Sequence, residues 1–152
     1  MTMSESKVPT VSIPSEALDD IARHAFACFP EECCGLLVGD RAAASATRFV
    51  PTTNIARSAK VYTIDPKEHL KAELAAEAEG LEIIGVVHSH THTQAYPSPT
   101  DVAQAVDPGW HYVIVSLMTA KAEPRCFLIA DGEITEESIR VVEAGRDISG
   151  RG

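Results

Sequence analysis

The sequence Leu81-Glu-Ile-Ile-Gly-Val-Val87 runs without a break into His88-Ser-His-Thr-His92. A nearly continuous apolar run of this length is typical of a β-strand that is covered on both faces. Because side chains alternate along a strand, His88 and His90 point to the same side at its end. The stretch therefore predicts a buried central strand that delivers two imidazoles to one site.

Upstream of this strand, the apolar spacing predicts an amphipathic helix that opens at Pro14-Ser-Glu16 and stops near Pro30. Short strands are expected around it, at residues 11–13, 35–39, 47–53 and 60–64.

A second helix is expected directly before the central strand. Asp65 is its predicted N-cap, Pro66 takes its first position and Gly80 ends it. Leu70 and Leu74 share one of its faces.

Downstream, Ser98-Pro-Thr-Asp101 predicts a short helix that reaches about Val106. A strand rich in aromatic and β-branched residues follows at residues 110–117. Asp131-Gly132 is a hairpin signal between two further strands, at residues 126–130 and 133–142.

Strands interleaved with about three helices predict a single-domain α/β fold, a mixed β-sheet flanked by helices. The 152 residues match the usual size of one domain, and 45% apolar with 23% charged residues is the balance of a globular protein. We expect the domain at residues 11–143, a flexible N-terminal arm at 1–10 and a flexible tail at 144–152.

The charge of the chain argues against two classes of partner. A net charge of −9, without a visible cluster of Lys or Arg, repels nucleic acid and anionic membranes. The N-terminus lacks the features of a signal peptide, and no apolar run is long enough to span a membrane, so a cytoplasmic location is expected. The sequence carries no indication of the oligomeric state.

The four cysteines, Cys28, Cys33, Cys34 and Cys126, form no C-x-x-C pair and no regular disulfide framework. They are interpreted as small buried hydrophobic residues.

The histidine pair fits catalytic zinc, which takes three protein ligands and keeps a fourth position for water. Asp101 can supply the third ligand, a carboxylate oxygen. Ser98 and Asp101 are equally typical of a helix N-terminus, with serine as the N-cap and an acidic residue three positions later, so both roles are open.

His88, His90, Ser98 and Asp101 stand at the spacing His-x-His, seven residues, Ser, two residues, Asp, which resembles the motif of the JAMM (MPN+) metalloproteases. Glu32-Cys-Cys-Gly35, ahead of a short apolar strand, resembles the context of that family's upstream glutamate. The resemblance extends from Pro51 through Val142, and it is to the bacterial branch of the family.

The resemblance implies the fold of the MPN/JAB1 domain, which is cytidine-deaminase-like, and one Zn²⁺ per chain held by His88, His90 and Asp101. It makes Glu32 the proton-accepting base, with the adjacent Glu31 as its competitor. Ser98 is implied as the hydroxyl that stabilises the oxyanion.

His92 departs from the family pattern, and three roles are open for it: contact with a metal ligand or with the substrate, solvent exposure, and metal ligation. His111 is expected to be a hydrogen-bonded core histidine, while His24 and His69 are assigned to no site. Arg57 and Lys60 are either ordinary exposed charges or receivers of a substrate carboxylate.

The function implied is that of a zinc-dependent peptidase or isopeptidase. Members of the bacterial branch cleave at the C-terminal tail of a ubiquitin-like sulfur-carrier protein, which is the partner that the resemblance suggests. The alternative is a non-catalytic MPN-type scaffold that binds a ubiquitin-like protein. A zinc deaminase is disfavoured because its H-x-E and P-C-x-x-C signature is absent.

Overall fold

The computed structural model describes residues 8–143, in which ten elements follow one another. There are seven strands, β1 (Thr10–Pro14), β2 (Cys34–Asp40), β3 (Ser45–Thr52), β4 (Glu82–His90), β5 (His111–Ser116), β6 (Glu123–Ala130) and β7 (Glu133–Val142). The three helices are α1 (Ser15–Cys28), α2 (Pro66–Ala78) and α3 (Pro99–Gln104).

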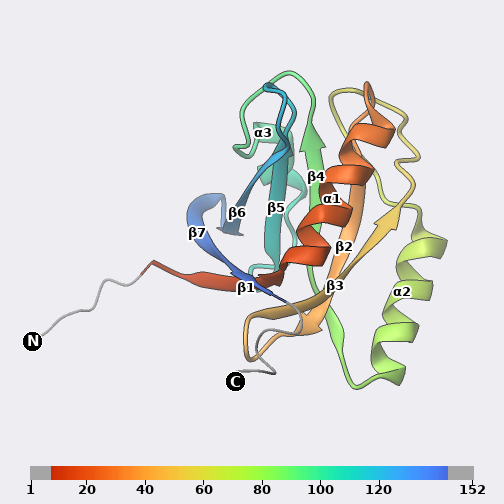
Figure 1. Cartoon of the computed structure of the whole chain (residues 1–152), viewed down its shortest axis with the longest axis vertical. Helices are drawn as coiled ribbons and strands as arrows, with labels where there is room; N and C mark the ends of the chain where they lie inside the picture. Colours follow the sequence, from red (N-terminus) through yellow and green to blue (C-terminus); the bar gives the residue numbers. More distant parts are fainter. Residues whose placement is uncertain (1–7, 144–152) are drawn as a thin grey trace, which may run out of the picture.

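The strands form one mixed sheet in the order β1-β3-β2-β4-β5-β6-β7. The β4–β5 and β1–β7 pairs are parallel, whereas β2 pairs antiparallel with both β3 and β4. The sheet closes into a barrel because β1 pairs along its length with β7 and through Ser12 with Ser45 of β3. Figure 1 shows β1 and β7 side by side below β5.

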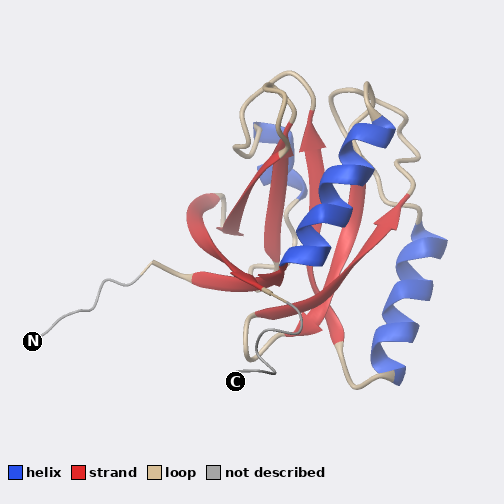
Figure 2. Ribbon diagram, viewed as in Figure 1, coloured by secondary structure: helices blue, strands red, loops and turns tan. Residues whose placement is uncertain are grey.

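β4 is buried on both faces, as its apolar sequence predicts. Ile84 and Val87 pack in one cluster with Ile21 and other apolar residues of α1. On the other face Ile83 packs with Ala72 and Ala76 of α2, whereas Val86 belongs to a cluster that includes Val102 of α3. Figure 2 shows α1 crossing the strands diagonally, with α2 beside them.

Local sequence signals account for the start of α2 and for the last hairpin. The Asp65 carboxylate accepts a hydrogen bond from the backbone N–H of Lys67 and caps α2. Asp131 and Gly132 both have positive φ, as the two-residue turn between β6 and β7 requires.

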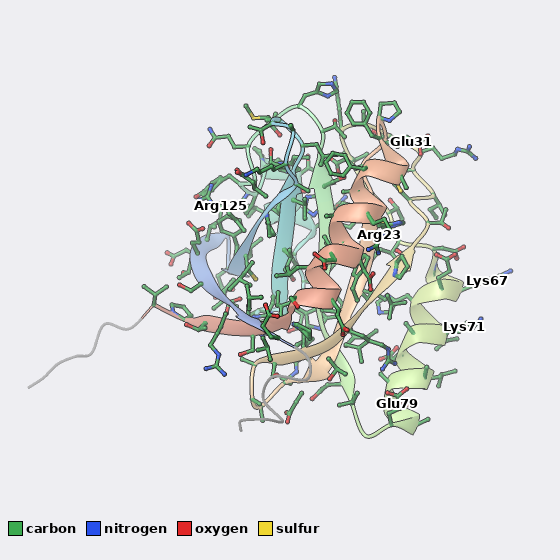
Figure 3. All side chains as sticks on the ribbon, viewed as in Figure 1. Arg23, Glu31, Lys67, Lys71, Glu79 and Arg125 are labelled. Atoms are coloured by element: carbon green, nitrogen blue, oxygen red, sulfur yellow. The ribbon has the colours of Figure 1, made fainter. Side chains whose placement is uncertain are left out.

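The face of α2 that carries Leu70 and Leu74 is exposed, and the helix packs instead through Ala72 and Ala76. Lys67 and Lys71 project from the outer side of the same helix in Figure 3.

One predicted strand is wrong. Residues 60–64 form no strand, and only Ile64 makes an isolated bridge, with Asn54. The apolar residues there are explained by packing without pairing, because Tyr62 and Ile64 turn inward against Val86 and its neighbours.

Of the expected flexible arm at residues 1–10, residues 1–7 lie outside the described residues, as does the whole expected tail at 144–152, and Thr10 already belongs to β1. Within residues 8–143, none of the helices has the length and hydrophobicity needed to cross a membrane.

Candidate metal centre

Three predicted site residues meet where β4 ends and α3 begins. His88 and His90 lie at the C-terminal end of β4, and Asp101 lies in the first turn of α3. The Nε2 atoms of the two histidines are 3.2 Å apart, and Asp101 Oδ2 lies 3.3 Å from His88 Nε2 and 3.1 Å from His90 Nε2. The local fold thus aims two nitrogens and one oxygen at a common point.

These separations can be tested against zinc geometry. Ligand atoms about 2.0–2.1 Å from a tetrahedral ion lie about 3.3 Å from one another. The donor atoms of His88, His90 and Asp101 already have nearly this spacing. The residues could therefore hold a divalent ion with little rearrangement, although their role as ligands stays a prediction.

Further hydrogen bonds fix the orientation of two of the three candidate metal ligands, His90 and Asp101. His90 Nδ1 lies 2.8 Å from the backbone carbonyl of Gln94, which leaves Nε2 as the nitrogen that faces the centre. The backbone N–H of Ser98 donates to Asp101 Oδ2 at 2.8 Å. The α3 N-terminus thereby holds the carboxylate in place.

Burial and hydrogen bonding set the charge states at the centre in opposite directions. Burial lowers the pKa of His88 in spite of its hydrogen bond to Asp101. Burial opposes protonation of His90 as well, but hydrogen bonds to Asp101 and to Gln94 outweigh it and raise its pKa. The same imidazoles hold the pKa of Asp101 well below its usual value, although burial alone would raise it. The carboxylate is therefore an anion ready to pair with a cation.

Glu32 lies beside this centre, in the connection between α1 and β2, and is only 4% exposed. Burial raises the pKa of its carboxyl group to about 8; the positive charge of His90 lowers it and the negative charge of Asp101 raises it. Among the described residues, Glu32 Oε1 and His88 Nδ1 are the buried side-chain atoms that lack a hydrogen-bond partner. A buried, unpaired carboxyl oxygen is expected where a water or substrate is to be bound.

Glu31 is placed differently from its neighbour. It lies half-buried near the C-terminal end of α1, at the top of the molecule in Figure 3. The contrast in burial favours Glu32 as the candidate base.

Ser98 is the N-cap of α3 and forms a capping box with Asp101. Its Oγ accepts the backbone N–H of Asp101 at 3.1 Å, so its own O–H remains available to donate. The capping role and a donor role therefore coexist, as the sequence allowed.

Two residues of the 53–65 connection support the centre and were not assigned to it from the sequence. The ring of Tyr62 stacks on His88 with centroids 4.5 Å apart. The Asn54 amide donates to the backbone carbonyl of Glu32 and to that of Val61, each at 3.0 Å. Both lie within the stretch from Pro51 through Val142 that resembles the family, but no local pattern gave either residue a role.

The remaining histidines lie away from these donors. His92 is exposed in the loop after β4, where it packs against Phe29 and not against the centre. His111 is buried and hydrogen-bonded to Glu137, which confirms its prediction as a core histidine. His24 and His69 lie on α1 and α2 and belong to neither candidate metal cluster of the described residues.

Arg57 and Lys60 are exposed, and the described residues provide no ion-pair partner for either. Cys33, Cys34 and Cys126 are buried and Cys28 is partly buried, all as free thiols.

Residues 14–130 match a family model described as prokaryotic homologs of the JAB domain. The chain is 38% identical over 144 residues to the CysO-cysteine peptidase of Mycobacterium tuberculosis, covering 94% of this chain and 99% of that one. It is 36% identical over 111 residues to the desampylase of Haloferax volcanii, covering 70% and 80% respectively.

A solved structure has the same fold. Protein DSY2949 from Desulfitobacterium hafniense superimposes with a TM-score of 0.80 at 32% identity, over 88% of this chain and 93% of that one. The predicted mixed sheet with three helices is confirmed, and with the family match over residues 14–130 the chain belongs to the prokaryotic JAB-domain family.

Proposed function

We propose that this protein is a zinc-dependent peptidase that hydrolyses a bond at the C-terminal tail of a ubiquitin-like sulfur-carrier protein. The observation that carries the proposal is the convergence of His88, His90 and Asp101 on one point beside the buried carboxyl of Glu32. Three ligands and an adjacent proton acceptor are what metal-assisted hydrolysis requires.

The proposed ligands are the Nε2 atoms of His88 and His90 and a carboxylate oxygen of Asp101. When bound, zinc supplies Lewis acidity, which polarises a carbonyl group and lowers the pKa of a coordinated water towards about 7. The Glu32 carboxyl, with a dication held beside it, would have a lower pKa, so that its carboxylate form would be available near neutral pH.

Glu32 acts as the general base and then as the general acid. Its carboxylate accepts a proton from the attacking water and returns that proton to the departing amine. Burial suits both steps, because a base whose pKa lies near the working pH gives up a proton as readily as it takes one.

Ser98 stabilises the charge that develops on the scissile carbonyl oxygen. Its backbone and Oγ are fixed by the capping box, while its O–H stays free to donate. A donor held in place before the reaction needs no reorganisation in the transition state.

The substrate assignment is supported by the relatives and by the charge of the chain. One relative is a CysO-cysteine peptidase and another is a desampylase. This chain covers most of the length of each. The protein's net charge of −9 disfavours nucleic acid as a ligand, whereas an extended protein tail is bound mainly through its backbone.

The test is to incubate the zinc-loaded protein with a ubiquitin-like sulfur carrier that bears one extra C-terminal residue. We expect the carrier to lose the mass of that residue, as measured by intact-protein mass spectrometry. Binding of the carrier without cleavage would favour the non-catalytic scaffold instead.

A matched pair of variants tests the base. Glu32→Gln removes the proton acceptor at nearly constant volume and should abolish turnover while the protein keeps its zinc. Glu31→Gln makes the same chemical change at the half-buried neighbour and should leave turnover within about twofold of wild type. Equal losses in both variants would refute the assignment of Glu32.

A further inference from the structure

A second group of metal-ligand side chains lies in the core, apart from the proposed active site. His111 of β5, Cys126 of β6 and Glu137 of β7 are all buried. One donor atom from each lies within 4.8 Å of the others. The three come from adjacent strands, with Cys126 directly paired to both Val113 and Glu137.

Strand register directs these side chains to one place. His111 is two residues from Val113 on β5 and therefore shares its face of the sheet. Val113 and Cys126 belong to the same core cluster, which also contains residues of α1. The group thus lies at the start of β5. His88 and His90 lie at the end of the parallel strand β4 and point to the opposite face of the sheet.

The contacts within the group are centred on one carboxylate oxygen. His111 Nδ1 lies 2.6 Å from Glu137 Oε1, and the Cys126 thiol donates to the same oxygen at 3.2 Å. The other charged pair of these strands, Arg125 with Glu136, is turned outward and half exposed, so it does not compete for Glu137. Figure 3 shows Arg125 on the outer side of the barrel.

We propose that His111, Cys126 and Glu137 form a second site for a thiophilic divalent ion such as Zn²⁺. Imidazole nitrogen, thiolate sulfur and carboxylate oxygen are the three donor types that zinc accepts. A thiolate and a carboxylate together balance the charge of the dication, so the occupied site is neutral inside the core. Neutrality matters because an uncompensated buried charge is costly.

Occupation of this site requires only local movement. Tetrahedral zinc separates its nitrogen and oxygen ligands by about 3.3 Å, so His111 Nδ1 and Glu137 Oε1 must part by about 0.7 Å. The thiol proton of Cys126 is released to solvent as the sulfur binds the ion.

Glu137 also borders an open groove of about 620 Å³, together with Pro124, Arg125 and Ser138 among others. The site differs in role from the catalytic centre, because the ion would tie β5, β6 and β7 together within the barrel. The proposal does not depend on the proposed peptidase function.

Cobalt distinguishes the two sites by their ligands. The proposed active site contains no cysteine, so a thiolate-to-cobalt charge-transfer band in the near ultraviolet reports only the second site. We expect the wild-type protein to bind two equivalents of Co²⁺ and to show this band. The double variant His88→Ala/His90→Ala should bind one equivalent and keep the band.

Cys126→Ser should remove the band, and Glu137→Gln should weaken Co²⁺ binding at this site by more than about 100-fold, the upper end of the loss caused by an outer-shell partner. Cys28→Ala is the matched control and should retain the band, because Cys28 lies on α1 outside the group. A wild-type protein that binds one equivalent and lacks the band would overturn the proposal without the use of any variant.

Discussion

Ser98 is held in a reciprocal pair of hydrogen bonds with Asp101, and the same residue is proposed to stabilise the oxyanion. Ser98→Ala removes one cap hydrogen bond and the free O–H together. We expect a loss of about 1 kcal/mol in the free energy of unfolding and a 100- to 1000-fold lower kcat, with zinc retained. Denaturant unfolding, steady-state kinetics and metal analysis measure the three quantities separately.

The capping part of this effect has an internal control. Asp65 caps α2 through the N–H of Lys67, and it takes no part in the metal centre. Asp65→Ala should cost a similar free energy of unfolding and leave kcat near wild type. If Ser98→Ala behaves like Asp65→Ala in both measurements, the serine is a cap alone.

Glu32 predicts a pH dependence of stability in the metal-free protein. Its pKa is about 8 in the folded state and 4.5 ordinarily, so the folded protein binds more protons than the unfolded chain between these values. The stabilisation from the protonated acid is complete below pH 4.5 and is lost as the pH rises through 8. Relative to wild type, Glu32→Gln should gain unfolding free energy as the pH rises from 4 to 9, by several kcal/mol at most, since each unit of pKa difference is worth about 1.4 kcal/mol.

Urea unfolding at several pH values in the presence of a chelator measures this difference. Titrating groups distant from Glu32 are shared by the two proteins and cancel in the comparison, whereas His90 and Asp101 contribute through their coupling to Glu32. Curves that stay parallel from pH 4 to pH 9 would mean that Glu32 is not desolvated in the folded state. Saturating zinc should reduce the difference, since a nearby dication favours the carboxylate.

At the scale of the elements, β4 and β5 approach each other closely at Gly85. A Cβ atom on Gly85 would lie 2.3 Å from the backbone oxygen of His111, which cannot move without separating the strands. We expect Gly85→Ala to lower the free energy of unfolding by about 3 kcal/mol. Activity should fall as well, because β4 carries His88 and His90 three and five residues further on.

Gly109→Ala is a suitable control for this prediction. Its Cβ atom would also come within 2.3 Å of another atom, but that atom is Nη1 of Arg41, at the end of a flexible and partly exposed side chain. We expect a cost within about 0.5 kcal/mol. Thermal unfolding of both variants tests whether it is the backbone contact that matters.

The elements were predictable to different degrees, for physical reasons. β4 could be predicted because both of its faces are covered, which leaves an unbroken apolar run. The 60–64 segment also carries apolar residues, yet its side chains pack against His88 and Val86 without strand pairing, because an apolar pattern reports burial and not pairing. Strand alternation predicted that His88 and His90 point to one side, and the family resemblance added Asp101, whereas nothing in the sequence indicated the burial of Glu32.

At the scale of the whole molecule, closure of the barrel was outside the reach of the sequence pattern. β1 and β7 come from opposite ends of the described chain, and no local signal specifies their parallel pairing. The same limit applies to the His111, Cys126 and Glu137 group. The sequence identified a core histidine and a buried cysteine, but their common partner Glu137 is set by the register of three strands.

The proposed active site joins β4 to α3, so zinc bound there should stabilise the whole fold. At a free zinc concentration of 100 times Kd, the gain is about 2.7 kcal/mol, or a rise in Tm of about 5 to 10 °C for a chain of this size.

To isolate this site from the second one, Tm is compared with and without chelator in the Cys126→Ser background. His90→Ala in that background should lose most of the zinc-dependent rise, because one of three ligands is missing. Ser98→Ala should keep it, because Ser98 is not proposed as a ligand. An unchanged rise after His90→Ala would place the stabilising ion somewhere other than between β4 and α3.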